Sequence, residues 1–231
     1  MMIICMEGEK KMEGLKALQR GLMIVFEGLD KSGKSTQVGW LVKALVDSGL
    51  KAEAVRFPDR LTPVGILIDQ FLNKKITMAP EAIHLLFSAN RWEKRVEMEQ
   101  KLAQQTHLVL DRYAYSGVAY TAAKGKYTQD FLKNPDRGLL RPDIVFYMDV
   151  DPTAAQQRGD YGEEVYEKLD FQQAVAKQFK LLKEDNWVLL DAAKSREEIH
   201  AAVLEEIRKY CEKKEKCEKE LSGLWSDFEK K

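Results

Sequence analysis

The sequence has neither a long hydrophobic run nor an excess of either charge. No apolar stretch approaches the ~18 residues that a membrane-spanning helix requires. Lysine and arginine together number 37, and aspartate and glutamate also number 37, so the formal net charge is zero. A protein that binds nucleic acid through its phosphates usually carries a concentrated positive charge. We therefore expect neither a membrane nor a nucleic acid as a partner.

Cysteine and histidine are also scarce, with three residues of each type. Cys5, Cys211 and Cys217 are odd in number and share no metal-site spacing, so we expect free thiols in a reducing compartment. The first residues, Met-Met-Ile-Ile-Cys-Met, are too few for the core of a signal peptide, and the acidic residues that follow are unlike a transit peptide. These features predict a cytoplasmic protein, with the nucleus as the alternative.

Internal repeats and low-complexity linkers are absent too, which argues for one domain. We expect this domain to span residues 21–210, after a flexible N-terminal extension over residues 1–20. The charged run that follows Tyr210 is typical of a solvated helix face, although a binding role would also explain it. Residues 211–231 are therefore predicted to form a charged C-terminal helix extension or tail.

Short apolar runs alternate with helical patterns along this domain. Alternation of this kind predicts right-handed β–α–β units around a parallel sheet. The longest helical pattern extends from Ala79 to Gln104. The candidate strands are Leu22–Phe26, Ala52–Phe57, His107–Leu110, Ile144–Val150 and Trp187–Leu190. The predicted fold class is therefore α/β, with a five-stranded parallel sheet flanked by helices on both faces.

Residues 28–35 read Gly-Leu-Asp-Lys-Ser-Gly-Lys-Ser, the G-x-x-x-x-G-K-[ST] pattern of a phosphate-binding loop. An apolar strand precedes the loop and an amphipathic helix follows it, which is the order that the motif requires. Backbone N–H groups of such a loop bind phosphate oxygens, Lys34 would reach the β- and γ-phosphates, and Ser35 would hold Mg²⁺. A glycine-rich turn without a ligand is the alternative. The motif predicts a nucleoside triphosphate as the ligand.

Two further segments place charged residues at strand ends, where ligands bind in open α/β sheets. Arg56-Phe-Pro-Asp-Arg60 follows the second candidate strand, and Asp111-Arg112-Tyr113 follows the third. A single arginine there would usually be a surface ion-pair partner, but two such segments opposite the phosphate-binding loop favour an anionic ligand. Asp111 follows Leu-Val-Leu, a pattern that positions Mg²⁺ in P-loop enzymes, although it could also cap the next helix.

Phe87 and Arg91 are four residues apart in the long helical pattern, so they share a face. An aromatic ring beside an arginine suits a nucleobase, which would stack on the ring and accept a hydrogen bond from the guanidinium. A place in the hydrophobic core is the alternative for Phe87.

The stretch Gln156-Gln-Arg158-Gly-Asp-Tyr-Gly162 is polar and carries two glycines between two helical patterns. A mobile lid over a triphosphate would have this composition, with Arg158 neutralising charge during transfer. An ordinary loop is the alternative. We place the predicted lid at about residues 156–166.

Together these segments resemble the thymidylate kinase family of eukaryotic type, which belongs to the P-loop nucleoside monophosphate kinases. The resemblance extends from Leu22 to at least Lys194. The strings that carry it are Gly28-Leu-Asp-Lys-Ser-Gly-Lys-Ser-Thr-Gln37, Arg56-Phe-Pro-Asp, His84-Leu-Leu-Phe-Ser-Ala-Asn-Arg-Trp-Glu93 and Asp111-Arg-Tyr-Ala-Tyr-Ser-Gly-Val-Ala-Tyr120. They occur in the order of the family.

The resemblance implies a role for each matching residue. Asp30 would take the sugar 3′-hydroxyl of dTMP, Phe87 would stack on thymine, and Arg91 would bond its carbonyl. The ring of Tyr120 would crowd the 2′ position of the sugar and disfavour ribonucleotides. The implied dTMP site comprises Asp30, Phe57, Arg60, Phe87, Arg91, Arg112, Ser116, Gly117, Tyr120, Tyr166 and Gln172. The implied ATP site comprises Gly28, Lys31, Ser32, Gly33, Lys34, Ser35, Thr36 and Arg158.

The implied reaction is transfer of the γ-phosphoryl group of ATP to dTMP, with Mg²⁺ held by Ser35 and Asp111. Lys34, Arg112, Lys31 and Arg158 would be the catalytic residues. The family usually has arginine where this chain has Lys31, which keeps the charge but loses the planar guanidinium. A homodimer is also implied. We expect dUMP to be a weaker acceptor, but only modestly so, because the thymine methyl makes only a small contact.

Three other functions fit parts of the sequence. Another nucleoside or nucleotide kinase would share the loop and the arginines. A GTPase switch would need a guanine-reading Asn-Lys-x-Asp segment, and the nearest string, Asn73-Lys-Lys-Ile, lacks the aspartate. A non-catalytic nucleotide-binding protein would not require Lys34, Ser35, Asp111 and Arg112, all of which are present.

Overall fold

The computed structural model describes residues 15, 18–125, 127–156, 158, 165–166, 168–213 and 221–226. Within them, β1 (Met23–Gly28), β2 (Ala52–Arg56), β3 (His107–Asp111), β4 (Ile144–Asp149) and β5 (Trp187–Asp191) form one sheet. All pairings are parallel, and the strand order is β2-β3-β1-β4-β5. The five-stranded parallel sheet predicted from the apolar runs is thereby confirmed.

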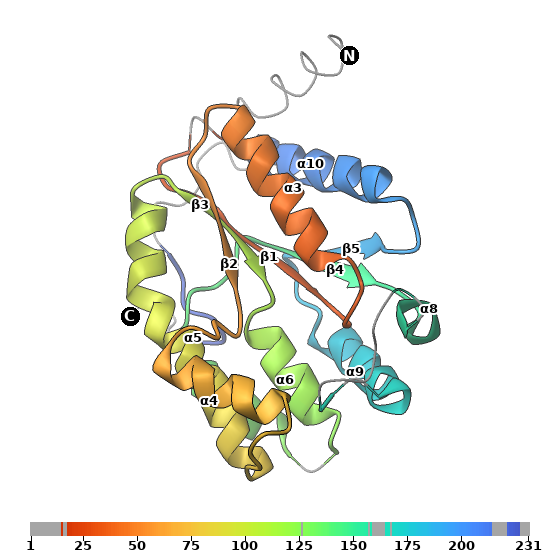
Figure 1. The fold of residues 1–231 in the computed structure, drawn as a ribbon. Coiled ribbons are helices and arrows are strands. Elements are labelled where there is room, and N and C mark those ends of the chain that lie inside the picture. Colours follow the sequence, from red (N-terminus) through yellow and green to blue (C-terminus); the bar gives the residue numbers. More distant parts are fainter. Residues whose placement is uncertain are drawn as a thin grey trace.

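Helices cover both faces of this sheet (Figure 1). The helices α3 (Lys34–Asp47) and α10 (Arg196–Lys213) lie together over one face, and α5 (Pro80–Ala103), α6 (Ala114–Ala122) and α9 (Leu169–Leu182) lie over the other. The shorter α4 (Pro63–Leu72) packs on α5, and α8 (Pro152–Gln156) packs on α9. The chain between α6 and β4 forms α7 (Gln129–Lys133) and the 3₁₀ helix η1 (Asn134–Asp136). Among the described residues, no helix is both long and apolar enough to cross a membrane.

The strand register positions the site. Every residue of β1 and β3 is buried, as expected for central strands of a sheet covered on both sides. Phe26 and Arg56 are both level with Asp111, and Gly28 is level with Met148. The chain therefore leaves β1, β2 and β3 at one edge of the sheet, where the predicted charged segments meet.

Both ends of the domain differ from the predicted boundaries. Leu15 and Leu18 belong to the hydrophobic core, and Arg20 forms an ion pair of 2.8 Å with Asp143. These residues were predicted to lie in the flexible N-terminal extension. The rest of that extension, residues 1–14 and 16–17, lies outside the described residues.

At the other end, residues 221–226 return to the domain instead of forming part of a charged tail. Gly223 pairs with Leu140 in an antiparallel bridge, and Leu224 is fully buried. The ring of Trp225 packs edge-on against Tyr115 at 5.5 Å. A few apolar residues after a long charged run give no periodic signal, so the sequence pattern did not predict this contact. Residues 214–220 and 227–231 lie outside the described residues.

Candidate active site

A cavity of about 760 Å³ lies at the carboxyl ends of β1, β2 and β3. This is the edge at which open α/β sheets bind their ligands. Most of the predicted site residues line it: Asp30, Lys31, Ser32, Gly33, Lys34, Ser35, Thr36, Phe57, Arg60, Phe87, Arg91, Asp111, Arg112, Ser116, Gly117, Tyr120, Arg158 and Tyr166. Gly28 and Gln172 are not part of the lining but contact residues that are, namely Arg112 and Asp30.

The phosphate-binding loop has the backbone geometry that its glycines permit. Gly28 and Gly33 have φ values of 145° and 97°, and a side chain at Gly28 would approach the Met148 carbonyl oxygen to 2.8 Å. The helix α3 starts directly after Gly33, and no side chain caps it. Its first N–H groups are therefore available to an anion, as the sequence motif predicts.

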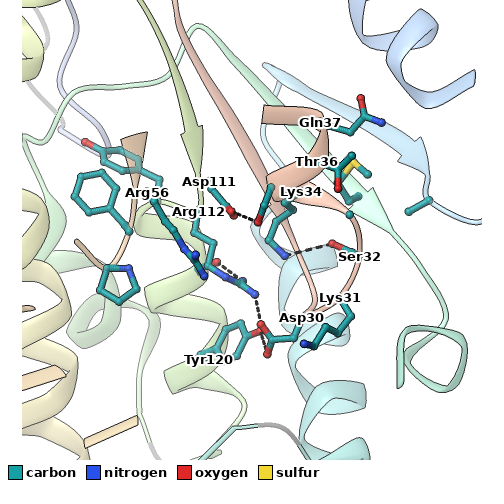
Figure 2. Close-up of a pocket in the computed structure, with 18 of the residues that line it drawn as sticks. Asp30, Lys31, Ser32, Lys34, Thr36, Gln37, Arg56, Asp111, Arg112 and Tyr120 are labelled. Carbon is teal, nitrogen blue, oxygen red and sulfur yellow. Dashed lines mark hydrogen bonds and ion pairs between the residues drawn. The ribbon is translucent and has the colours of Figure 1, made fainter. Parts of the chain in front are cut away.

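Lys34 is folded across this loop and is buried. Its Nζ donates to the Leu29 carbonyl oxygen at 2.5 Å. It also donates to Ser32 Oγ at 3.3 Å (Figure 2). Burial, together with the positive charge of Arg112, lowers the pKa of Lys34 to about 8, although nearby carboxylates act in the opposite direction. The ammonium group is thus still mostly charged at neutral pH, but it loses its proton at a lower pH than an ordinary lysine.

Ser35 and Asp111, the predicted metal ligands, are in direct contact. Ser35 Oγ, in the first turn of α3, donates to Asp111 Oδ2 at 2.5 Å. The N-cap residue of α6 is Tyr113, and the side chain that accepts from N–H groups at this helix start is Glu27, so Asp111 does not have the alternative capping role. Hydroxyl and carboxylate oxygens suit Mg²⁺, which is usually held by one or two side chains together with phosphates and water. This pair fits that ligand set, although no larger cluster of metal-ligating side chains occurs in the described part of the chain.

Asp30 and Arg112 form the centre of a second network (Figure 2). Arg112 pairs with Asp30 Oδ1 and also donates to the Gly28 carbonyl oxygen at 2.9 Å. Asp30 Oδ2 accepts from Tyr120 Oη at 3.0 Å and from Gln172 Nε2 at 2.7 Å. Burial alone would raise the pKa of Asp30, but the charges of Arg112 and Lys34 and these hydrogen bonds lower it below its ordinary value. Asp30 is therefore a carboxylate.

A buried carboxylate that sequence reasoning missed supports this network from behind. Glu27 is fully buried in β1 and accepts from the Tyr113 and Ser116 backbone N–H groups at 2.9 and 3.0 Å, and from Ser116 Oγ at 2.5 Å. Burial raises its pKa, although the bonds from Ser116 and the charge of Arg112 oppose that rise. Glu27 thus anchors the start of α6 to the strand before the phosphate-binding loop. Its signal in the sequence was a charged residue within an otherwise apolar strand.

Phe87 and Arg91 line the opposite wall, on α5. Phe87 is partly buried and packs on an apolar cluster of Ile68, Leu72 and Ile83, so its predicted ligand role and its alternative core role are compatible. Arg91 forms an ion pair of 2.7 Å with Asp136, a residue that sequence reasoning did not select.

Three other predicted residues that line the cavity bond to or stack on other parts of the chain. Arg60 pairs with Asp69 at 2.8 Å, and Arg158 donates to the Ala192 carbonyl oxygen at 2.8 Å. The ring of Tyr166 stacks on Phe171 at 5.3 Å. Most of the predicted lid, namely residues 157 and 159–164, lies outside the described residues.

The cavity also extends past the loop to residues after β5 that were not predicted. Ala192, Lys194, Ser195, Arg196 and Ile199 line this part. The rule that ligands bind at strand ends would have identified this segment had it been applied to the fifth strand as well. Arg56, at the end of β2, lines the cavity in the segment that was predicted to bind an anion.

Comparisons with known proteins agree on one family. The family model for thymidylate kinase matches residues 26–203. A thymidylate kinase of Danio rerio is 48% identical over 185 residues, covering 79% of this chain and 87% of the relative. A thymidylate kinase of Homo sapiens is 44% identical over 214 residues, covering 90% of this chain and 99% of the relative. The solved structure of thymidylate kinase from Candida albicans has a TM-score of 0.77 and 36% identity, covering 83% of this chain and 94% of that one.

The matched residues contain the phosphate-binding loop, Arg91 on α5 and Arg112 directly after β3. The resemblance stated from the sequence motifs is therefore confirmed, and with it the fold class. This chain belongs to the thymidylate kinase family and is a phosphotransferase.

Proposed function

We propose that the cavity transfers the γ-phosphoryl group of ATP to dTMP, giving ADP and dTDP. The observation that carries this proposal is that the phosphate-binding loop and the Phe87–Arg91 pair line one cavity. Its volume of about 760 Å³ lies within the range of roughly 300–1,000 Å³ that is typical of ligand pockets. A donor triphosphate and an acceptor nucleotide would then meet near Arg112.

ATP would bind on the side of the loop. Its phosphates would lie against the N–H groups of Gly28, Lys31, Ser32, Gly33, Lys34, Ser35 and Thr36. Lys31 has a left-handed backbone with φ 59°, and its exposed side chain lines the cavity, which would allow it to contact the transferring group. Arg158 is also at the cavity wall and would approach the triphosphate from the lid, the segment at about residues 156–166.

dTMP would bind on the side of α5 and α6. An ionised carboxylate offers about four acceptor positions, and Arg112, Tyr120 and Gln172 occupy three of those of Asp30. One position is left for the sugar 3′-hydroxyl. Phe87 would stack on thymine, Arg91 would donate to its carbonyl, and the Tyr120 ring would crowd a 2′-hydroxyl. The remaining contacts to sugar and phosphate would come from Phe57, Arg60, Arg112, Ser116, Gly117 and Tyr166.

The reaction needs no general base from the protein. The second pKa of a phosphate monoester is about 6, so the acceptor oxygen is already ionised at neutral pH. Correspondingly, none of the three histidines, all within the described residues, lines the cavity. Catalysis would consist of positioning and charge neutralisation by Lys34, Lys31, Arg112 and Arg158. Mg²⁺, held by Ser35 and Asp111, would supply further charge neutralisation at the phosphates.

The protein would act as a homodimer in the cytoplasm or nucleus, without nucleic-acid or membrane partners. Exposed apolar side chains on α4 and α5, namely Ile66, Leu67, Leu85 and Val96, support a self-association surface. Sedimentation equilibrium would test this, since a monomer at micromolar concentration would contradict it.

An acceptor panel tests the proposed reaction. ADP release is measured with ATP and Mg²⁺ and with dTMP, dUMP, dCMP, dGMP or thymidine as the acceptor. We expect dTMP to be the best acceptor and dUMP a weaker one, because a methyl contact contributes only about 1–3 kcal/mol. The Candida albicans thymidylate kinase has broad substrate specificity, so weaker acceptors deserve measurement here too. A preference for thymidine over dTMP would indicate a nucleoside kinase, and no turnover with any acceptor would indicate a non-catalytic protein.

A further inference from the structure

Arg91 is held by a carboxylate far from it in the sequence. Its Nε and Nη2 donate to Asp136 Oδ1 and Oδ2 at 3.1 and 2.7 Å. Asp136 is completely buried, and 3% of the Arg91 side chain is exposed. The pair therefore joins α5 to η1 in a region that excludes water, where two parallel hydrogen bonds fix the plane of a guanidinium group.

This contact uses the edge of the guanidinium that carries Nε and Nη2, and it does not involve Nη1. Among the described residues, Nη1 has no hydrogen-bond partner, and Arg91 lines the cavity. On α6, Gly117 lies against the same group, because a Cβ there would be 2.9 Å from Nη2 and 3.2 Å from Nη1. The guanidinium is thus confined between Asp136 and the backbone of α6, with Nη1 as its available donor.

Asp136 is itself held from two directions. Ser88, one turn before Arg91 on α5, donates to Asp136 Oδ1 at 2.7 Å, and Trp92 Nε1 donates to the Pro135 carbonyl oxygen at 2.7 Å. The chain just after η1 is paired with the C-terminal residues, since the Gly138 N–H donates to the Leu224 carbonyl oxygen at 2.9 Å. The position of Asp136 is therefore determined by α5 and by the C-terminal segment together.

A buried ion pair contributes little net stability compared with apolar side chains of the same volume. The two parallel hydrogen bonds from Arg91 to Asp136 instead fix the orientation of the Arg91 guanidinium. We propose that Asp136 is a positioning residue that directs Nη1 of Arg91 to the carbonyl oxygen at ring position 4 of the acceptor base. Asp136 would thereby favour thymine over cytosine, which carries an amino group at the ring position of that carbonyl. This inference rests on the proposed function of the cavity.

The test is Asp136→Asn in the full-length protein, assayed with dTMP and dCMP. The amide keeps one acceptor oxygen but turns an N–H group toward the guanidinium, so the orientation of Arg91 is lost. We expect the KM for dTMP to rise about tenfold or more, as for a lost hydrogen bond to a charged group, with the KM for ATP changed less than about twofold. The ratio of kcat/KM for dTMP to that for dCMP should fall by a similar factor. The matched control is Asp130→Asn, an exposed aspartate on α7 beside Arg137, which should leave all values unchanged.

A double-mutant cycle separates orientation from general support of the fold. Adding Asp136→Asn to Arg91→Met should change kcat/KM for dTMP by less than about twofold, because the residue would act only through Arg91. A further tenfold loss in that background, or equal losses for dTMP and dCMP in the single variant, would overturn the proposal. If Asp136→Asn does not fold, Ser88→Ala is the alternative test, because Ser88 holds Asp136 through its hydroxyl. This variant should raise the KM for dTMP about threefold, and an unchanged KM would overturn the proposal. Failure of the proposed function is distinct, because it would show as absent dTMP turnover in the unmodified protein.

Discussion

Lys34 should make nucleotide binding depend on pH above pH 7. The structure buries its ammonium group against two loop oxygens and near Arg112, which lowers its pKa to about 8 from the ordinary 10.5. The phosphates of a bound nucleotide place negative charge at this ammonium, so the charged form is the one that binds. Raising the pH of the free protein therefore removes the proton that binding requires.

The magnitude follows from this pKa. With a pKa of about 8, about nine tenths of Lys34 is charged at pH 7 and about one tenth at pH 9. The apparent Kd is the intrinsic value divided by the charged fraction, so it should rise about tenfold between these pH values. The terminal phosphate of a nucleotide has already lost its second proton above pH 7 and does not titrate in this range.

Isothermal titration calorimetry with ADP and with a non-hydrolysable ATP analogue measures this effect. At pH 9 the binding heat should also depend on the ionisation enthalpy of the buffer, because about one proton is taken up with each nucleotide. The matched variant is Lys34→Arg, whose guanidinium stays charged throughout and should give a flat Kd from pH 7 to 9. A flat Kd in the unmodified protein, without proton uptake, would refute the lowered pKa and the reasoning from burial.

Three other predictions concern Arg112, Phe87 and His107. Arg112→Ala should lower kcat with dTMP about a hundredfold or more, the usual effect of losing one charged contact to the transition state; circular dichroism should show an intact fold, and near-normal turnover would exclude a catalytic role. Phe87→Ala should raise the KM for dTMP more than that for ATP, whereas equal increases would assign Phe87 to the core alone. Nδ1 of the buried His107 accepts a hydrogen bond from the Leu22 N–H at 3.0 Å, and burial lowers its pKa to about 4 from 6.5. The unfolded chain therefore binds the extra proton in this window, so the free energy of unfolding should fall by about 3 kcal/mol as the pH falls from 6.5 to 4. Urea denaturation of the unmodified protein and of His107→Gln checks this, and an equal fall in both would contradict it.

The parts of the site that lie in continuous segments could be predicted from the sequence. The phosphate-binding loop depends on the backbone angles of neighbouring residues, so its residue pattern and flanking elements suffice to identify it. The parallel sheet followed from the apolar runs, and its strand ends predicted that Arg56 and Asp111 would meet the loop. In the structure, Arg56 at the end of β2 is paired with Asp111 at the end of β3.

Residues that act on one another over long separations could not be predicted in this way. Glu27 and Ser116 are 89 positions apart, and Arg91 and Asp136 are 45 apart. Such contacts depend on the angles at which helices pack and on where a connecting segment returns, neither of which is encoded in a local pattern.

By itself the sequence determined the family, the sheet and the phosphate-binding loop, because each depends on local backbone geometry or on the periodicity of apolar residues. Only the tertiary structure decided that Asp136 holds Arg91, that Glu27 anchors α6, and that residues 221–226 pack beside η1. The physical reason is that a buried charge requires a partner, and the partner's identity is settled when separate elements pack together.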